Sequence, residues 1–214
     1  MSLSSLLTPE AVLREYFHAK DENRPHLLDR VFTSDASLQI NNNCSNITFP
    51  TVTQGRGAIA DTLVTQFNKT YENIYSFYLA RPPEAADSFS CAWLVGMTEK
   101  DTKNTRVGCG TYDWTFSLES PRLASALVIS IHAMVVLPPS TASVVFPWLQ
   151  RAGYPWSSAA RVCELAPPLP ELDPVVRHLE GHAAGASTAD AQRRCARSPV
   201  TPGATSSAST WRSG

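Results

Sequence analysis

Apolar residues at helical spacing predict three helices in the first seventy residues of the chain. The first helix begins at Thr8-Pro9, where a hydroxyl caps a free backbone N–H and proline needs none of its own. A short helix from Pro25 and a third from Gly57 repeat the one-sided pattern. The residues expected to face inward are Val12, Leu13, Tyr16, Phe17, Leu27, Leu28, Val31, Phe32, Ile59, Leu63, Phe67 and Tyr71. Such helices need a sheet to cover them.

From residue 73 onward, the apolar spacing changes to the period of two that is typical of strands. Four strands separated by turn-like stretches are predicted, and a short strand at 36–40 precedes the third helix. The four ranges are 74–80, 89–98, 106–117 and 127–137. Consecutive strands with short connections make an antiparallel meander. Helices followed by a meander predict an α+β fold with the helices on one sheet face.

The composition of the chain changes after Trp156. Residues 1–156 carry the strong periodic signals and are predicted to form one domain. In the extension, 157–214, one short helix is expected near 173–181, and from Ala183 small and polar residues dominate. Such a segment buries too little apolar area to offset the entropy of ordering it. We therefore expect the last thirty or so residues to be disordered.

The charge balance argues against nucleic acid as a partner. Lys and Arg together number 18 against 19 acidic residues, and no basic stripe is present that would neutralise a run of phosphates. The N-terminus has no cationic start, and the longest apolar run, 123–137, is too short to span a bilayer as a helix. We predict a soluble cytoplasmic protein that does not bind membranes.

The sequence predicts neither a metal nor a cofactor. The five cysteines are scattered and form no C-x-x-C pair, so neither a disulfide framework nor a zinc site is indicated. No Ser-His-Asp, phosphate-loop or metal-ligand arrangement is visible. Cys91 and Cys109 lie on predicted strands and are interpreted as small buried apolar residues.

Three short segments carry a resemblance to a known family. They are Val-Leu-Arg-Glu-Tyr-Phe at 12–17, Val-Phe-Thr-Ser-Asp-Ala at 31–36 and Gly-Arg-Gly-Ala-Ile at 55–59. Together with the order of the predicted elements, they make roughly the first 150 residues resemble the nuclear transport factor 2-like superfamily, which includes ketosteroid isomerase and the SnoaL-like cyclases. The resemblance implies a cystatin-like cone, in which a curled antiparallel sheet carries the N-terminal helices on its concave face and an apolar pocket opens at the wide end.

The resemblance also suggests positions for chemistry. Matched without gaps, the oxyanion tyrosine of ketosteroid isomerase falls on Tyr16, and its general base falls on Ile40, which cannot take a proton. The oxyanion acid falls near Tyr112-Asp113, where a shift of one residue reverses the faces. We favour the register that turns Tyr112, Trp114 and Phe116 inward and Asp113 outward, where His132 is a potential cross-strand partner of Asp113.

The leading functional hypothesis is a SnoaL-like domain that binds a small apolar molecule. Tyr16 and Tyr112 are expected to orient a carbonyl or hydroxyl group on it, although large aromatic residues in such positions also serve simply as core. The expected ligand-binding residues are Tyr16, Phe32, Phe67, Trp93, Tyr112 and Trp114.

Two alternatives stay open at this point. The first is an isomerase, dehydratase or cyclase whose base is His18, Asp35 or Asp113. The second is a dimeric protein–protein adaptor, with a homodimer formed through the outer sheet face. Arg56 lies at a helix start, where it either helps to hold an anion or fixes the turn.

Overall fold

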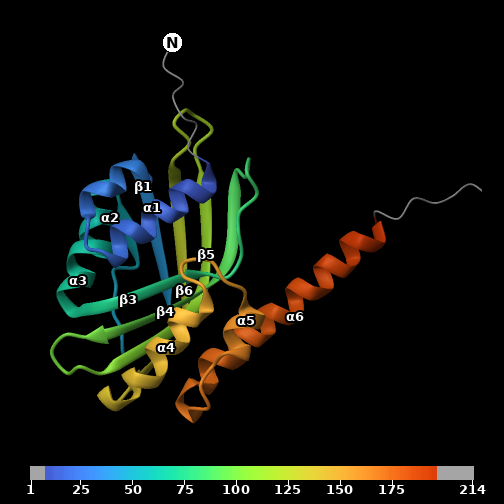
Figure 1. Ribbon diagram of the computed structural model, residues 1–214. Helices are drawn as coiled ribbons and strands as arrows, with labels where there is room; N and C mark the ends of the chain where they lie inside the picture. The colour runs from blue at the N-terminus through green and yellow to red at the C-terminus, as the bar shows by residue number, and fades with distance from the viewer. Residues whose placement is uncertain (1–7, 197–214) are drawn as a thin grey trace, which may run out of the picture.

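One curled sheet of six strands forms the centre of the protein (Figure 1). The computed structural model describes residues 8–196. The strands are β1 (Phe32–Asn42), β2 (Val52–Gln54), β3 (Tyr71–Tyr78), β4 (Ser88–Glu99), β5 (Thr105–Phe116) and β6 (Ala124–Leu137). Their order across the sheet is β2-β1-β6-β5-β4-β3. The predicted meander of four consecutive strands, β3 to β6, is confirmed.

The sheet is mixed, which the sequence did not indicate. Strand β1 pairs antiparallel with β2 but parallel with β6. The prediction of an antiparallel sheet therefore holds for all neighbouring pairs except this one. Parallel pairing needs a long crossover connection, and here the segment from β2 through β5 supplies it. Strand β1 also begins at Phe32, before the predicted 36–40.

The N-terminal helices lie on the concave side of the sheet, as predicted (Figure 1). They are α1 (Pro9–Asp21), the 3-10 helix η1 (Pro25–Arg30), α2 (Arg56–Ala60), the π-helix η2 (Asp61–Gln66) and α3 (Phe67–Thr70). The predicted cap is present, since the Thr8 side chain accepts a hydrogen bond from the Ala11 N–H at 3.2 Å. The predicted stripe of α1 is buried against the sheet: Val12, Leu13, Tyr16 and Phe17 are at most 1% exposed.

A second group of helices packs on the outer side of the sheet (Figure 1). It comprises η3 (Pro139–Thr141), α4 (Ala142–Ala152), α5 (Ala159–Glu164), η4 (Pro170–Leu172) and α6 (Asp173–Ala196). Leu172, Val175 and Leu179 are at most 1% exposed and belong to the same apolar cluster as Leu94 and Val107 of the sheet. Helix α6 is thus longer than the short helix expected near 173–181. The last thirty or so residues were expected to be disordered. Of these, residues 197–214 lie outside the described part of the chain.

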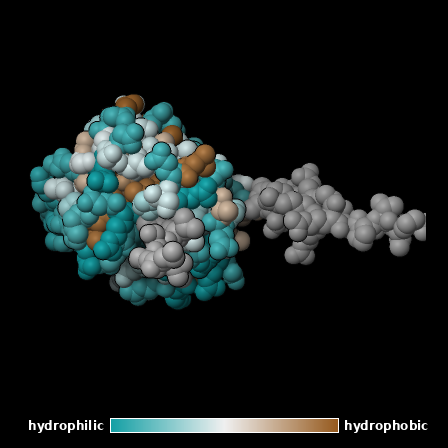
Figure 2. Space-filling view, turned by 90° about the horizontal axis from the view of Figure 1, so that it is seen from above, coloured by the Kyte–Doolittle hydropathy of each residue, from teal (hydrophilic) through white to brown (hydrophobic). Residues whose placement is uncertain are grey.

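The surface seen in Figure 2 is mostly hydrophilic, with hydrophobic residues scattered over it. Large apolar side chains that are well exposed include Val52 and Leu118, which lie far apart in the sequence. Within residues 8–196, no helix combines the length and hydropathy that crossing a membrane requires.

Candidate functional site

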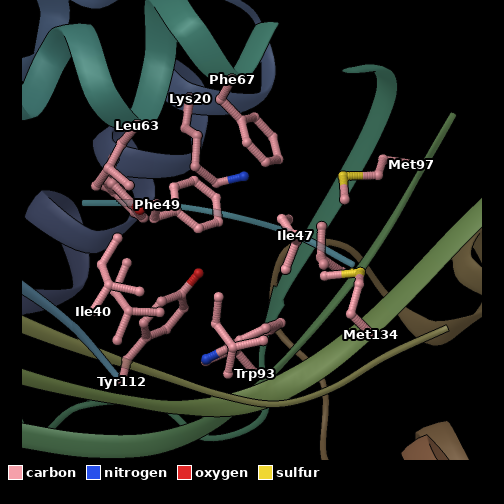
Figure 3. A pocket seen from close by; sticks show the side chains of 14 residues that line it. Lys20, Ile40, Ile47, Phe49, Leu63, Phe67, Trp93, Met97, Tyr112 and Met134 are labelled. Carbon is pink, nitrogen blue, oxygen red and sulfur yellow. The ribbon is translucent and has the colours of Figure 1, made fainter. Parts of the chain in front are cut away.

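An apolar cavity of about 50 Å³ lies between the concave face of the sheet and the N-terminal helices (Figure 3). Its walls come from α1, β1, the β1–β2 loop, η2, α3 and strands β4 to β6. The lining residues are Tyr16, Lys20, Ile40, Ile47, Phe49, Leu63, Phe67, Trp93, Val95, Met97, Tyr112, Ile129, Ile131 and Met134. A water molecule needs roughly 10–15 Å³ on this measure, so the cavity is only a few times larger than one water. A larger guest requires flexible lining residues such as Met97 and Met134 to move.

Tyr16 contributes a buried hydroxyl to this region. The residue is 0% exposed, and its hydroxyl has no hydrogen-bond partner of regular geometry among the described residues. Its ring packs edge-on against Trp114, with ring centroids 5.1 Å apart, which fixes its orientation. Burial raises the pKa of Tyr16, and the negative charge of Asp21 raises it further. The hydroxyl therefore stays protonated and can donate a hydrogen bond.

Tyr112 brings a second phenol from the sheet side. The favoured register is observed: Tyr112, Trp114 and Phe116 belong to the concave core, and Asp113 is exposed on the outer face. The ring of Tyr112 stacks on Trp93 at 5.6 Å, and in Figure 3 its hydroxyl points into the cavity. Burial again raises the pKa well above its usual value, so this group is also a neutral donor. A contact of hydrogen-bond type between the Tyr16 and Tyr112 side chains contributes to the pKa of both phenols, so the two hydroxyls approach each other without reaching the geometry of a regular hydrogen bond.

Lys20 is a cavity residue that the reasoning from sequence missed. Its Nζ donates to Asp21 Oδ1 and to Ser76 Oγ, both at 2.7 Å, and lies 4.8 Å from the centre of the Phe67 ring. The side chains of Lys20 and Asp21 are only 7% and 3% exposed. The signal that could have found it is spacing, because Lys20 follows Tyr16 by four residues and so shares its helix face.

The six expected ligand-binding residues divide into two groups. Tyr16, Phe67, Trp93 and Tyr112 line the cavity. Phe32 and Trp114 are not among the lining residues; they are buried behind Tyr16, with their rings stacked at 5.8 Å. Ile40, which stands where the resemblance places the general base, is in the cavity wall.

The three candidate bases all lie away from the cavity. His18 is on the exposed side of α1, where it contacts Glu15 and Glu22. Asp35 is exposed on β1. Asp113 accepts a hydrogen bond from Ser90 Oγ at 2.5 Å on the outer face.

The predicted pairing of His132 with Asp113 is wrong. Asp113 lies opposite Val128 in the β5–β6 register, whereas the ring of His132 stacks with that of His178 at 4.3 Å. His178 comes from α6, and reasoning from strand register alone takes no account of a helix docked on the outer face.

Other residues singled out in the sequence have structural positions. Arg56 forms an ion pair with Asp29 at 2.8 Å and donates to the Phe32 carbonyl at 3.2 Å, so it ties the turn to the start of β1. Cys91 and Cys109 are buried, and burial raises the pKa of each thiol to about 12. Among the described residues, no group of His, Cys, Asp and Glu side chains is arranged to hold a metal ion.

Comparison with known proteins gives similarity in structure only. No family model matches the chain, and no curated protein matches it. Among solved structures, it is similar to a nuclear transport factor 2-like superfamily protein from Salmonella enterica serovar Typhimurium LT2, with 16% identity over 58% of this chain and 88% of that one and a TM-score of 0.48.

Two further solved structures have comparable likeness. Hexachlorocyclohexane dehydrochlorinase LinA-type3 from Novosphingobium barchaimii LL02 is 11% identical over 59% of this chain and 85% of that one, with a TM-score of 0.47. A ketosteroid isomerase-like protein from Erwinia carotovora atroseptica SCRI1043 is 13% identical over 62% and 99%, with a TM-score of 0.45. The chain itself has the curled sheet with N-terminal helices on its concave face that its sequence predicts.

Proposed function

We propose that the chain binds a small, largely apolar molecule in the concave cavity. The observation that carries this proposal is the Tyr16 hydroxyl, which is buried beside the cavity and whose approach to the Tyr112 hydroxyl falls short of a regular hydrogen bond. A buried hydroxyl without a hydrogen bond costs about 1–3 kcal/mol. An oxygen atom on a bound molecule would accept that hydrogen bond and remove the cost.

The composition of the cavity wall supports the same proposal. Apart from Tyr16, Lys20 and Tyr112, the lining residues are all apolar or aromatic, without a charged or hydroxyl group. Ligand sites typically combine such a wall with a few polar groups that set the orientation of the ligand. The guest is therefore mainly hydrocarbon, with one oxygen-bearing end near the two phenols.

Binding is better supported than isomerisation, dehydration or cyclisation. Those reactions need a group that abstracts a proton within hydrogen-bond reach of the substrate. The candidate carboxylates and the candidate imidazole face solvent, and Ile40 stands at the position of the family base. The ionisable side chains in the wall are Lys20 and the two phenols. All three act as hydrogen-bond donors, so none of them is ready to abstract a proton.

A thermal-shift screen of small aromatic and alicyclic compounds tests the proposal. A compound that binds only the folded protein stabilises it by RT ln(1 + L/Kd), where L is the free concentration of the compound and Kd its dissociation constant. We expect oxygen-bearing hits to raise the melting temperature of the wild type and to raise that of Tyr16→Phe by clearly less.

Tyr75→Phe is the matched control, because Tyr75 lies on the outer side, where its hydroxyl interacts with Gln150. Removing that hydroxyl is expected to leave the ligand-induced shift unchanged. Equal shifts in wild type and Tyr16→Phe would contradict the proposed site.

A further inference from the structure

Lys20 brings a charged group into a cavity wall that is otherwise almost entirely apolar. In Figure 3 the ammonium enters from the helix side beside Phe67, while the hydroxyl of Tyr112 points in from the sheet side. Removing two charges from water costs several kcal/mol per ion unless geometry and hydrogen bonds compensate. If the lysine served only to fill space in the core, an apolar residue could replace it with little loss of stability.

The surrounding network holds the ammonium in one position. Asp21 accepts from Lys20 Nζ, from the Ser76 N–H at 3.0 Å and from Ser76 Oγ at 2.8 Å. Ser76 Oγ also accepts from Lys20 Nζ at 2.7 Å, and Tyr154 donates to Asp21 at 3.2 Å. An ammonium has three N–H donors. Two are used here, and the third has no hydrogen-bond partner in the described part of the chain. The Nζ atom itself lies 4.8 Å from the centre of the Phe67 ring and 5.9 Å from that of Phe17.

We propose that Lys20 donates this third N–H to an oxygen of the bound molecule, and that the molecule is a neutral carbonyl compound. The proposal rests on the cavity being a ligand site and adds the chemical class of the ligand. Lys20 and Tyr16 are then donors to the same oxygen-bearing end of the guest.

A carbonyl oxygen suits the donors better than an alcohol does. The ammonium only donates, and both phenols are protonated. A carbonyl oxygen offers two lone pairs and brings no donor of its own. An alcohol would add an O–H that needs an acceptor inside a wall made mostly of apolar side chains.

A carboxylate is disfavoured by the charge of Asp21. Lys20 and Asp21 are in contact at 2.7 Å and together carry no net charge. An anion in the cavity would lose its hydration and would meet the negative field of Asp21 as well as the positive field of Lys20. Burial is the main cause of the raised pKa of Tyr16 and Tyr112, and the Asp21 charge adds to the rise in both. Negative charge beside the phenols is therefore unfavourable.

Three probes of matched shape test this inference by NMR titration of the full chain. Acetophenone has the carbonyl, α-methylstyrene replaces its C=O by C=CH₂, and benzoate replaces its methyl group by O⁻. A hydrogen bond to a charged donor contributes on the order of tenfold in affinity or more. We expect acetophenone to bind the wild type at least about tenfold more tightly than either α-methylstyrene or benzoate.

The double variant Lys20→Met/Asp21→Asn removes the ion pair as a unit, because Lys20→Met alone would leave a buried carboxylate unpaired. The preference for acetophenone over α-methylstyrene should fall to roughly threefold or less, which is the contribution of a neutral phenol donor. The affinity for α-methylstyrene, measured for each variant, is the reference for this ratio. Lys69→Met, which removes an exposed lysine from the neighbouring α3, should behave as the wild type.

The possible results separate the two proposals. If the double variant keeps the tenfold preference, Lys20 is not the donor and the cavity proposal stands without it. If benzoate binds the wild type most tightly, the neutral class is wrong. If none of the three probes binds the wild type, the cavity proposal fails, and this inference fails with it.

Discussion

Tyr16 and Tyr78 belong to the same apolar core but differ in the hydrogen-bond partner of the hydroxyl group. Tyr16 and Tyr78 are both 0% exposed. The Tyr78 hydroxyl donates to the Leu13 carbonyl at 3.0 Å and so ties β3 to α1, whereas the Tyr16 hydroxyl has no partner among the described residues. The first arrangement stabilises the fold, and the second leaves a donor without a regular hydrogen bond at a cost in stability.

This contrast predicts opposite effects of removing one oxygen. In the absence of ligand, Tyr78→Phe should lower the free energy of unfolding by about 1 kcal/mol, because a buried hydrogen bond is lost. Tyr16→Phe should leave it unchanged or raise it by up to about 1 kcal/mol, because an unsatisfied hydroxyl is removed. Urea denaturation of both variants measures the difference. A loss of stability in Tyr16→Phe as large as that in Tyr78→Phe would show that its hydroxyl has a structural partner.

Among the elements, β5 has its bend at Gly110, where the pairing with β6 shifts register. A Cβ atom at this position would lie 1.8 Å from the Ser130 carbonyl oxygen and 2.8 Å from the Trp93 ring. Only a residue without a side chain allows the two strands to approach in this way. The shape of the cavity depends on the bend, because Trp93 is one of its walls.

Gly110→Ala is therefore expected to lower the free energy of unfolding by at least about 2 kcal/mol, since the backbone of β6 would have to move. Gly57→Ala is the matched control, because Gly57 is in α2 and a Cβ atom there would have no neighbour within 4 Å. Alanine at this position should be neutral or stabilising by up to about 1 kcal/mol. Thermal or urea denaturation checks the pair, and equal effects would contradict the steric explanation.

Helix α6 packs on the outer face through apolar contacts and through a cluster of three imidazole rings. The ring of His178 lies 4.3 Å from that of His132 on β6 and 4.9 Å from that of His182. Burial, with a further contribution from the two neighbouring histidines, lowers the pKa of His178 from 6.5 to about 4. The docked helix thus favours the neutral form of this ring.

Docking of α6 should consequently weaken as the pH falls from 6.5 toward about 4. In this window, the free helix binds a proton at His178 and the docked helix does not, so acid favours release. Hydrogen exchange of residues 173–184, corrected for its intrinsic pH dependence, measures docking. His178→Phe should reduce the pH dependence, while the exposed control His26→Gln should keep it. The same profile in both variants would contradict the assignment to His178.

Across the whole molecule, the sheet separates two apolar cores. The concave core contains the cavity, and the outer core joins β3 to β6 with α4, α5 and α6. The outer face is therefore partly covered by the chain itself. The part that stays exposed is mainly polar, with residues such as Ser90, Asp113, Thr115, Gln39 and Asn41, and it includes the apolar Val52, which pairs with Gln39 and is 64% exposed.

The homodimer predicted from the sequence stays a prediction, and the exposed polar part of the outer face is where we propose that it forms. Stable dimers usually bury larger and more apolar surfaces. We expect weak pairing, detectable by light scattering at submillimolar concentration and lost at low micromolar concentration.

Thr115→Glu should abolish this pairing, because a two-fold contact would bring the added charges together. Ser45→Glu, in the exposed loop after β1, should have no effect. A dimer that persists at low micromolar concentration, or that survives Thr115→Glu, would contradict the proposed interface.

Features that depend on local periodicity could be predicted from the sequence alone. The stripe of α1 and the inward register of Tyr112 follow from spacings of 3.6 and 2 residues, which neighbouring residues set without help from the rest of the chain. Tyr16, Phe67, Trp93 and Tyr112 were found for the same reason, because large apolar side chains at those spacings must face the interior, whereas Phe49, in the β1–β2 loop, follows no such spacing and was missed.

Contacts between distant segments, by contrast, emerged only in the folded chain. Lys20 meets Ser76 across 56 positions, β1 pairs parallel with β6, and Val175 of α6 is buried against the outer core. No periodic signal encodes these pairings, because their free energy comes from burial and hydrogen bonds that exist only once the chain has folded. A lysine on an amphipathic helix looks solvent-exposed in sequence, and its buried ion pair beside an unsatisfied phenol became visible in the folded protein alone.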